Sequence, residues 1–394
     1  MSKEAITGNV GEWSEVYVFF HILSTQRIFP CDASLNPYDY GYPVLEIIRI
    51  GKDEEEHFIF NEASLKWHKN EDSRGFDVEI DPEKCEVAAR NFLEELRAAK
   101  KNGDKGAFRM PQCEAFLGSL GATKFKADPK RKTDIKLKIS DARAGATPVC
   151  GFSIKSFLGK EPTLFNSTKG DDRNGRAGSS SFVYNVTLDG LNDEMVQELN
   201  TLSAELLVRE IYKRGGNMTY IDDTIEGSIF RSNLRFIDAC MPRMLAEIAV
   251  FYRKEDLKNI KEVTEAFASK DIFEFRSHMW YRYKMKKMLE ASAFGMTAGT
   301  PWEGHEDANG GFIVVKPNGD VVTYHIYNRQ ELLDYLYQGT RFEHCSQSKE
   351  RNDYGYIYKD GPSNQWRIRL QIQIRYIKPT SLLSACPHGN KNTR

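Results

Sequence analysis

The sequence predicts an α/β (α+β) fold with a helical middle region and a C-terminal β-rich module. Three observations predict it. Strand and helix patterns alternate over residues 1–190, helical patterns occupy 191–300, and short strand patterns dominate 301–380, before a tail at 381–394 that we expect to be flexible. A chain of 394 residues is long enough to bury a large core in each of these regions.

The N-terminal region begins with a helix and continues with strands. An apolar stripe predicts the helix over about 11–24, and its members are Val16, Phe19, Phe20 and Leu23. Residues 44–50 are mostly apolar and rich in β-branched side chains, and 57–60 have the pattern of a partner strand. A periodic helix follows from Pro82 to before Gly103, and a shorter helix is expected over 111–120.

The later regions change from helix to strand. Asn192 is expected to cap one long helix that Gly215-Gly216 stops. Helical patterns continue over 231–293 with breaks near Lys254 and Ser269. Residues 310–325 then predict a β-hairpin with Asn-Gly at its turn, followed by a short helix over 329–337 and three more strands that end near Tyr376.

Composition excludes several classes of protein. Lysine and arginine number 55 against 56 aspartates and glutamates, so no global positive field marks a nucleic-acid binder. The seven cysteines are scattered without a Cys-x-x-Cys pair, which predicts neither a zinc site nor a disulfide framework. The N-terminus lacks the apolar core of a signal peptide, and no apolar run reaches the length of a membrane span. We therefore expect a cytoplasmic protein without a membrane partner.

Two neighbouring strand patterns, 132–138 and 151–156, carry polar residues that suggest chemistry. Side chains alternate along a strand, so Ser153 and Lys155 face the same way. If the strands pair as a hairpin, Asp134 can lie beside that polar face. A carboxylate, a second oxygen ligand and a lysine on one sheet surface are the ingredients for Mg²⁺-assisted cleavage of phosphodiester bonds. The pattern therefore raises the hypothesis of a nuclease.

Each candidate has a predicted role in such a site. Asp134 and the backbone carbonyl of Ile154 are candidate metal ligands, and Lys155 would polarise water or stabilise the phosphate. Ser153 stands where a second acid is commonest in nucleases of this geometry, which leaves the site short of negative charge. Glu12 and Glu15 share a face of the first helix at i, i+3 spacing. We expect Glu15 to be the missing acid and metal ligand, with Glu12 as the alternative.

Longer motifs then resemble a known family. They are Gly8-Asn9-Val10-Gly11-Glu12-Trp13-Ser14-Glu15, Gly151 to Gly159, Thr163 to Asn166, Ala308 to Val315 and Tyr324-His325. Together they resemble the HpaII family of type II restriction endonucleases over about residues 8–376. The resemblance implies the PD-(D/E)XK nuclease superfamily, with a restriction-endonuclease-like mixed β-sheet flanked by helices and a catalytic core at 1–190. It also implies Mg²⁺-dependent cleavage of double-stranded DNA.

The resemblance assigns residues as well. The superfamily's aspartate corresponds to Asp134 and its lysine to Lys155. The first motif is similar to the glycine-containing first helix of the MutH and Sau3AI nucleases, whose active-site glutamate corresponds to Glu15. This sequence departs from the superfamily pattern at Thr133, where proline is usual, and at Ser153, where an acid is usual.

A CCGG-like recognition site is also expected from the resemblance. Arginine or lysine held bidentate on guanine would read such a site. Candidate DNA-binding residues lie in the basic strand region, in the polar loop over 166–181 and in the C-terminal module: Lys132, Lys136, Asn166, Arg173, Arg176, Arg329, Lys349 and Arg351.

The expected partners follow from this activity. A palindromic site favours a homodimer, and a companion DNA methyltransferase is expected in the same restriction-modification system without forming a stable complex. Three alternatives remain open: a structure- or damage-specific DNA repair nuclease, a catalytically inactive DNA-binding protein, and an α/β protein with no nucleic-acid role.

Overall fold

A computed structural model gives the arrangement of the chain. It describes residues 6–50, 55–71, 76–101, 106–122, 133–142, 145–168, 180–221, 228–343 and 354–379. The chain forms two compact units. Unit 1 contains Met1–Pro162, Glu306–Leu332 and Lys378–Arg394, and unit 2 contains Thr163–His305 and Leu333–Ile377.

Unit 1 is built around a mixed sheet, which has nine strands among the described residues. Eight of them follow the order β12-β11-β7-β6-β2-β3-β4-β5, and β1 pairs with β2. Of the strand pairs described in this sheet, only β7–β11 is parallel. The strands are β1 (Arg27–Ile28), β2 (Tyr42–Ile50), β3 (Glu55–Asn61), β4 (Lys66–Glu71), β5 (Phe76–Ile80), β6 (Ile135–Ile139), β7 (Val149–Ser156), β11 (Gly311–Val315) and β12 (Val321–His325).

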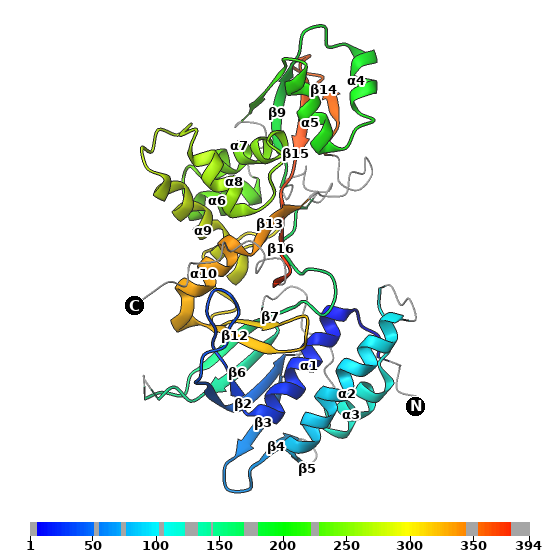
Figure 1. Ribbon diagram of the computed structural model, residues 1–394, viewed down its shortest axis with the longest axis vertical. Helices are drawn as coiled ribbons and strands as arrows, with labels where there is room; N and C mark the ends of the chain where they lie inside the picture. The colour runs from blue at the N-terminus through cyan, green and yellow to red at the C-terminus, as the bar shows by residue number, and fades with distance from the viewer. Residues whose placement is uncertain are drawn as a thin grey trace, which may run out of the picture. The chain divides into compact units, whose positions relative to one another are not determined.

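Three helices pack together against one side of this sheet: α1 (Val10–Thr25), α2 (Pro82–Lys101) and α3 (Pro111–Ser119) (Figure 1). The strands direct alternate side chains into the core that these helices cover. On β6, Ile135, Leu137 and Ile139 are buried and the two lysines between them are half-buried. On α1, Trp13, Phe19 and Phe20 are fully buried in the same core. Burial on the scale of such side chains contributes about 1.5–3 kcal/mol each.

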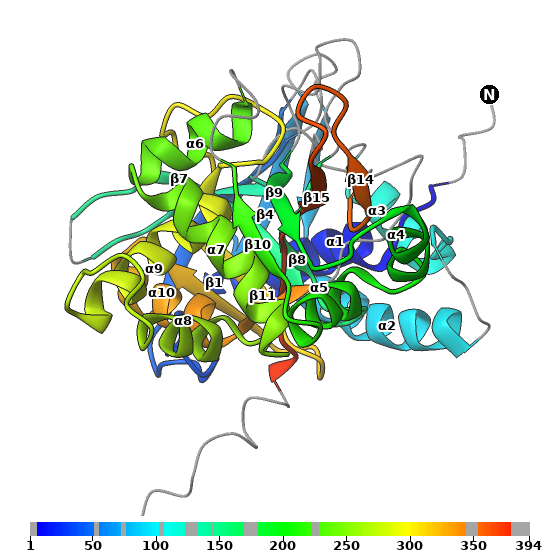
Figure 2. The same ribbon diagram turned by 90° about the horizontal axis from the view of Figure 1, so that it is seen from above.

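Unit 2 has two smaller sheets and most of the remaining helices. One sheet has the order β10-β9-β15-β14 and the other β13-β16-β8. Helices α6 to α9 lie together in both views (Figures 1 and 2). The strands are β8 (Thr163–Phe165), β9 (Phe182–Thr187), β10 (Asn217–Tyr220), β13 (Thr340–Glu343), β14 (Ile357–Lys359), β15 (Trp366–Leu370) and β16 (Gln373–Tyr376), and the helices are α4 (Asp193–Leu199), α5 (Ala204–Lys213), α6 (Ile229–Ile237), α7 (Met241–Lys254), α8 (Ile260–Ala268) and α9 (His278–Phe294).

The expected α/β class and mixed sheet flanked by helices are confirmed. After β12, a short 3₁₀ turn (Ile326–Asn328) leads into α10 (Arg329–Gln338), which contains the boundary between the two units. The C-terminal strands are therefore shared: β11 and β12 join the large sheet, whereas β13 to β16 belong to unit 2. The division of the chain at residues 190, 300 and 380 into separately folding regions stays a prediction.

Two details of the expected secondary structure are wrong. The single helix after Asn192 is two helices, because the side chain of Asn200 leaves the helix and bonds both backbone groups of Ile357, at 2.7 Å and 2.9 Å. Ser203 then caps α5. The described residues after α10 also form four strands where three were expected. In the described part of the chain, no helix is long and apolar enough to cross a membrane.

Candidate active site

The candidate site is built where β6 begins beside β7. These strands pair antiparallel, with Ile135 opposite Phe152, so the expected hairpin is confirmed. Asp134 comes directly before β6, and its backbone N–H donates to the carbonyl of Phe152 at 2.9 Å. The register therefore places Asp134 next to Ser153.

Hydrogen bonds connect the three polar side chains in one line. Oδ2 of Asp134 accepts from the backbone N–H of Ile154 at 2.6 Å and from the hydroxyl of Ser153 at 3.2 Å. The ammonium group of Lys155 donates to the same hydroxyl at 2.8 Å. The structure thus brings Asp134, Ser153 and Lys155 together, with the serine between the carboxylate and the ammonium group.

The surroundings of this line restrict its movement. Ser153 is buried, with an exposed fraction of 1%. Lys155 is half-buried, and its ammonium group lies 5.6 Å from the centre of the Phe312 ring, which favours a cation. Phe312 is opposite Ser153 on the parallel strand β11. Strand pairing between segments distant in sequence therefore holds the lysine in place.

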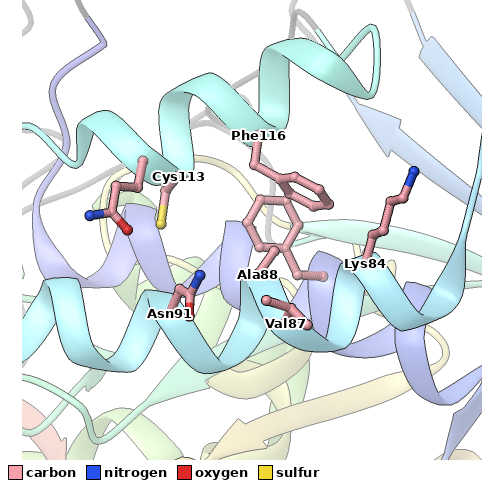
Figure 3. Close-up of a pocket in the computed structure, with 8 residues that line it drawn as sticks. Lys84, Val87, Ala88, Asn91, Cys113 and Phe116 are labelled. Atoms are coloured by element: carbon pink, nitrogen blue, oxygen red, sulfur yellow. The ribbon is translucent and has the colours of Figure 1, made fainter.

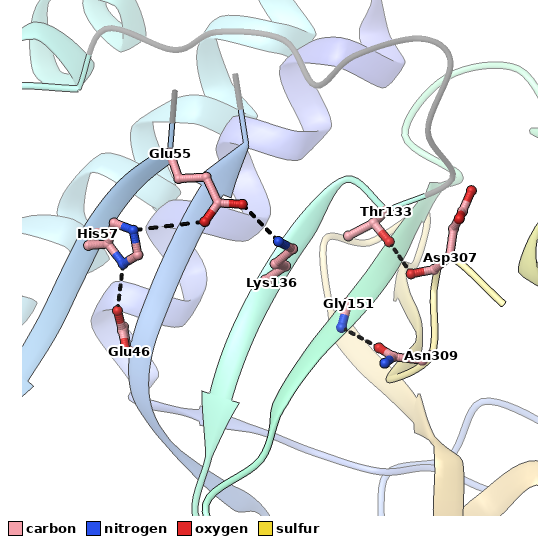
Figure 4. Close-up of polar contacts among 8 residues, drawn as sticks. All are labelled: Glu46, Glu55, His57, Thr133, Lys136, Gly151, Asp307 and Asn309. Carbon is pink, nitrogen blue, oxygen red and sulfur yellow. Dashed lines mark hydrogen bonds and ion pairs between the residues drawn. The ribbon is translucent and has the colours of Figure 1, made fainter. Parts of the chain in front are cut away.

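A close backbone approach holds the start of β6 against β7 and the segment before β11 (Figure 4). The Thr133 hydroxyl donates to the carbonyl of Asp307, and the Gly151 N–H donates to Oδ1 of Asn309 at 2.8 Å. A Cβ atom at Gly151 would lie 2.7 Å from Oγ1 of Thr133. One at Gly310 would lie 2.7 Å from the Cβ of Cys150. These glycines are therefore required by the packing that positions Asp134.

Helix α1 begins with a capping box. The side chain of Asn9 accepts from the N–H groups of Gly11 and Glu12, at 2.8 Å and 3.1 Å. The Glu12 carboxylate accepts in return from the backbone N–H of Asn9 at 2.7 Å. This arrangement satisfies donors that a helix start otherwise leaves open. It assigns Glu12 a structural contact, while its alternative role as the site acid stays a prediction.

The same helix reaches the end of β7. Oγ of Ser14 and Oγ of Ser156 lie 2.7 Å apart. A Cβ at Gly159 would lie 3.0 Å from Val10, so the loop after β7 also packs tightly against the helix start. Glu15, the next residue on α1, is half-buried. Burial lowers the pKa of Arg49 on β2, and the charges of Glu56 and Glu15 oppose this shift without cancelling it.

Strand order relates these contacts to Asp134. The sheet runs β7-β6-β2, so β6 lies between the strand that Ser14 contacts and the strand that carries Arg49. On β2, Ile48 is opposite Lys136, and Arg49 is one residue further toward the Asp134 end of β6. Arg49 therefore shares with Ile47 and Ile135 the face of the sheet that α1 covers, whereas Ser153 and Lys155 face the other way.

The oxygen groups present fit a hard cation better than a soft one. Asp134 and Glu15 are carboxylates, Ser153 is a hydroxyl, and Ile154 offers a backbone carbonyl. Within the ranges described, no group of three or more His, Cys, Asp or Glu side chains is arranged to hold a metal ion. Mg²⁺ is commonly bound through one or two carboxylates and keeps several waters, whereas a structural zinc ion requires four protein ligands. The donor set therefore suits a hard divalent cation.

Three of the predicted DNA-binding residues have partners within the chain. Lys136 pairs with Glu55 at 2.7 Å (Figure 4), Arg329 pairs with Glu306, and the Asn166 side chain accepts from Gln373 at 3.0 Å. Their role on DNA stays a prediction. The other five lie outside the described residues: Lys132, Arg173, Arg176, Lys349 and Arg351.

A pocket of about 290 Å³ lies among the helices of unit 1 (Figure 3). Its walls are mostly apolar and come from α1, α2 and α3, with Phe20, Val87 and Phe116 among them. Burial raises the pKa of the Cys113 thiol in its wall, so this cysteine is not an activated nucleophile. The polar side chains of the candidate site, by contrast, lie at the start of β6 and on β7.

Sequence reasoning singled out Thr133 and the run from Ala308 to Val315 but missed the contacts by which this part of the chain supports the site. Asn309, Asp307 and Thr133 fix the approach of β6 to β7, yet they lie far apart in the sequence. Arg49 was also missed, because its place among Ile47, Ile48 and Ile50 reads as an ordinary outward position on a strand. The one available signal was the Asn309-Gly310-Gly311 run, where two glycines before a strand indicate close backbone contact.

Comparison with known proteins agrees with this arrangement. The family model for the HpaII restriction endonuclease matches residues 9–376. The type II restriction enzyme HpaII of Haemophilus parainfluenzae is 33% identical over 382 residues, which cover 95% of this chain and 99% of that protein. No solved structure matches the chain. Because both matches extend over nearly the whole sequence, the chain belongs to the HpaII restriction endonuclease family.

Proposed function

We propose that this protein is a type II restriction endonuclease that hydrolyses phosphodiester bonds of double-stranded DNA at a specific sequence with Mg²⁺. The observation that carries the proposal is the hydrogen-bonded line of Asp134, Ser153 and Lys155 on adjacent strands. Membership of the HpaII family supports the same activity.

In this proposal, Asp134, Glu15 and the carbonyl of Ile154 hold the metal ion. Glu15 is included because it is half-buried on α1 directly after Ser14, which contacts the end of β7. A bound Mg²⁺ would supply positive charge at the phosphate and lower the pKa of a bound water.

The protein's own side chains would stabilise the phosphate and hold the site residues in place. The Lys155 ammonium, already oriented by Ser153 and by the Phe312 ring, would donate a hydrogen bond to a phosphate oxygen as negative charge develops there. Ser153 would hold both the lysine and Asp134 in place through one hydroxyl. Such preorganised donors act without reorganising during the reaction, which is how they lower its barrier.

Cleavage of plasmid DNA tests the proposal. The protein should produce discrete fragments with Mg²⁺ and none with EDTA. Asp134→Ala and Lys155→Met should each lower the cleavage rate by at least about a hundredfold while leaving DNA binding in place. Lys66→Met is a matched control, because Lys66 forms an exposed pair with Glu79 on β4 and β5. Cleavage by the Asp134 variant at the parental rate would show that the metal site is assigned to the wrong residues.

We also propose a CCGG-like recognition site, cut by a homodimer, in a system that includes a DNA methyltransferase. The two-fold symmetry of such a site supports a symmetric dimer. Sequencing the ends of plasmid fragments identifies the site, and analytical ultracentrifugation with a site-containing duplex gives the stoichiometry. Fragment ends that share no sequence, with cleavage directed to mismatches or single strands, would instead indicate a structure- or damage-specific repair nuclease.

Ser153 favours one alternative of a different kind. With a hydroxyl where an acid is usual, the protein could bind DNA specifically without cutting it. Specific gel shifts without cleavage at any Mg²⁺ or Mn²⁺ concentration would establish that alternative. Salt dependence is the shared control, because phosphate contacts make affinity fall steeply as salt rises.

A further inference from the structure

The sheet β10-β9-β15-β14 of unit 2 has one apolar face and one polar face. Side chains alternate along a strand, and the register aligns one polar row across all four strands: Thr219, Asn185, Arg367 and Tyr358. These four residues are exposed or half-buried. Their neighbours in sequence point to the other face and are buried there: Met218, Tyr184, Ile368 and Ile357. The Tyr184 hydroxyl donates to the carbonyl of Ala246 at 2.7 Å, so α7 covers the apolar face.

The hairpin β14–β15 carries two arginines on the polar face. Arg367 and Arg369 are two residues apart on β15, so both side chains point to the same side of the sheet. In the described strand order β14 is the last strand, and the turn that joins it to β15, residues 361–365, is exposed (Figure 2). A two-stranded ribbon fits the major groove of DNA, which is about 12 Å wide.

Two contacts orient the guanidinium of Arg367. Its Nη1 atom lies 2.9 Å from Oδ1 of Asp360 in the turn, and its Nε–H donates to Oδ1 of Asn185 on β9 at 3.4 Å. Only 19% of the Arg367 side chain is exposed. Its Nη2 atom has no hydrogen-bond partner among the described residues, so the guanidinium can still donate to a ligand.

An aromatic ring orients Arg369. Its Cζ atom lies 4.6 Å from the centre of the Tyr358 ring on β14, which is a cation–π contact. Hydrogen bonds from Ser363 lower the pKa of Asp360, and the charges of both arginines lower it further. Two cations, Arg367 and Arg369, therefore share the one carboxylate of Asp360. This excess of positive charge on the polar face of the hairpin is complementary to DNA.

We propose that Arg367 and Arg369 read guanine bases from the major groove and so determine the sequence at which this enzyme cuts. This rests on the proposed cleavage at a specific sequence. An arginine reads guanine by donating two hydrogen bonds, to O6 and N7, which requires its planar guanidinium to be held in one orientation. Contacts within the sheet already orient both guanidinium groups, so less side-chain freedom is lost when DNA binds.

Competition gel shifts with the full-length protein, with Ca²⁺ in place of Mg²⁺, test the proposal without relying on cleavage. The probes are a duplex with the sequence read from the parental fragment ends and the same duplex with that sequence scrambled. Arg367→Lys and Arg369→Lys keep the charge and lose the two-point contact, so each should bind the site duplex about fivefold to a hundredfold more weakly. Affinity for the scrambled duplex should stay within about twofold, because lysine still contacts phosphates.

Arg214→Lys is the matched control. Arg214, which caps the end of α5, is also held by acids within unit 2: Glu198 at 2.6 Å and Glu210 at 2.8 Å. Helix α5 packs on α7, which covers the apolar face of the sheet, so this change should leave the preference for the site duplex unchanged. Parental preference in both Arg367→Lys and Arg369→Lys would overturn the proposal. An equal loss of affinity for both duplexes would also overturn it, because it indicates contacts to phosphates alone.

Modified DNA gives a test that leaves the protein unchanged. Replacing one guanine of the site duplex by 7-deazaguanine removes the N7 acceptor in the major groove. The parent should lose affinity at each guanine that is read, and the corresponding lysine variant should lose no more at that position. If the parent binds every singly substituted duplex as tightly as the unmodified one, guanine is not read in this way and the proposal is overturned.

A further variant decides if a lysine variant does not fold. Asp360→Asn keeps both arginines and removes the charge that orients Arg367, so it should lower the preference for the site duplex. An unchanged preference in Asp360→Asn would overturn the role of Arg367.

The parent protein separates failure of this inference from failure of the proposed function. If the parent cuts plasmid DNA into fragments with a common end sequence while both lysine variants keep the parental preference, only the role of Arg367 and Arg369 is overturned. If the parent prefers no sequence in cleavage or in binding, the proposed site-specific cleavage fails and the role of these arginines fails with it.

Discussion

Gly151→Ala is the sharpest test of how the site is assembled. Gly151 is on β7, where an added Cβ atom would meet Thr133, the residue before Asp134. A Cβ atom there would lie 2.7 Å from Oγ1 and 2.9 Å from Cγ2 of Thr133, and 3.0 Å from the carbonyl oxygen of Asp307. Because the backbone conformation of Gly151 is not in the left-handed region, the effect of alanine is steric alone.

The expected displacement follows from these distances. Ordinary contacts of a Cβ atom begin at 3.4 Å, so the neighbouring atoms must move by about 0.4 to 0.7 Å. Thr133 directly precedes Asp134, whose Oδ2 is held at 2.6 Å and 3.2 Å by its two donors. Overpacking of this size costs about 1–3 kcal/mol of stability. Misplacing catalytic groups by about 1 Å lowers rates about a hundredfold, so we expect a loss of roughly tenfold to a hundredfold in cleavage.

The assay is a double-mutant cycle with Thr133→Ala. Alanine at 133 removes both side-chain atoms that the new Cβ would meet and leaves only the carbonyl of Asp307. The double variant should therefore cleave plasmid DNA faster than Gly151→Ala alone, although Thr133→Ala by itself loses a hydrogen bond. Gly118→Ala on α3, where a Cβ meets nothing within 4 Å, is the control and should cleave normally. Normal cleavage and melting by Gly151→Ala, or no rescue by Thr133→Ala, would refute the reasoning.

Three further predictions concern the same unit. Gly311 and Gly106 have similar φ angles of 119° and 101°, but a Cβ at Gly311 would lie 1.8 Å from a backbone oxygen of β12, whereas one at Gly106 meets nothing within 4 Å. In urea titrations, Gly106→Ala should lose about 1–2 kcal/mol and Gly311→Ala more than about 4 kcal/mol; similar losses would contradict the packing of β11 on β12. Burial lowers the pKa of His325 to about 4, although the charge of Asp141 raises it. Between pH 6.5 and 4 the unfolded chain therefore takes up a proton that the folded chain refuses, so the free energy of unfolding should fall by roughly 3 kcal/mol as pH is lowered through this window. His325→Phe should flatten that dependence, and an unchanged slope would assign it to other groups. Ser153→Asp places a carboxylate beside that of Asp134, so the melting temperature should fall without metal and rise more than in the parent when Mg²⁺ is added; an equal rise in both proteins would place the metal elsewhere.

Local sequence patterns predicted the elements whose periodicity is strong. The helix α1, strand β2 and the hairpin β11–β12 were predicted from their apolar residues, and each contributes such residues to the same core. Strand β4 was missed because its sequence, from Lys66 to Glu71, is almost entirely polar. The break between α4 and α5 depends on the contact of Asn200 with Ile357, which no local pattern contains. Pairing between distant segments overrides local preference in both cases.

The candidate site was predicted in part for the same reason. Asp134, Ser153 and Lys155 are close in sequence and lie on a hairpin, so strand alternation alone brings them together. The contacts that hold them involve Asp307 and Asn309, more than 150 residues further along the chain. The parallel pairing of β7 with β11 brings these segments together, and nothing in either strand specifies that partner by itself.

Charge explains why a serine can occupy the acid position. A carboxylate at residue 153 would be buried like the present hydroxyl and would lie about as close to Asp134, at 3.2 Å. Two such charges repel by roughly 5 kcal/mol at an effective dielectric constant of 20, and the metal-free protein would bear this repulsion. Serine removes the repulsion and still links Asp134 to Lys155. In our proposal the second negative charge comes from Glu15 on α1, whose charge also favours the protonated guanidinium of Arg49. The same carboxylate thus serves the stability of unit 1 and, in our proposal, the binding of Mg²⁺.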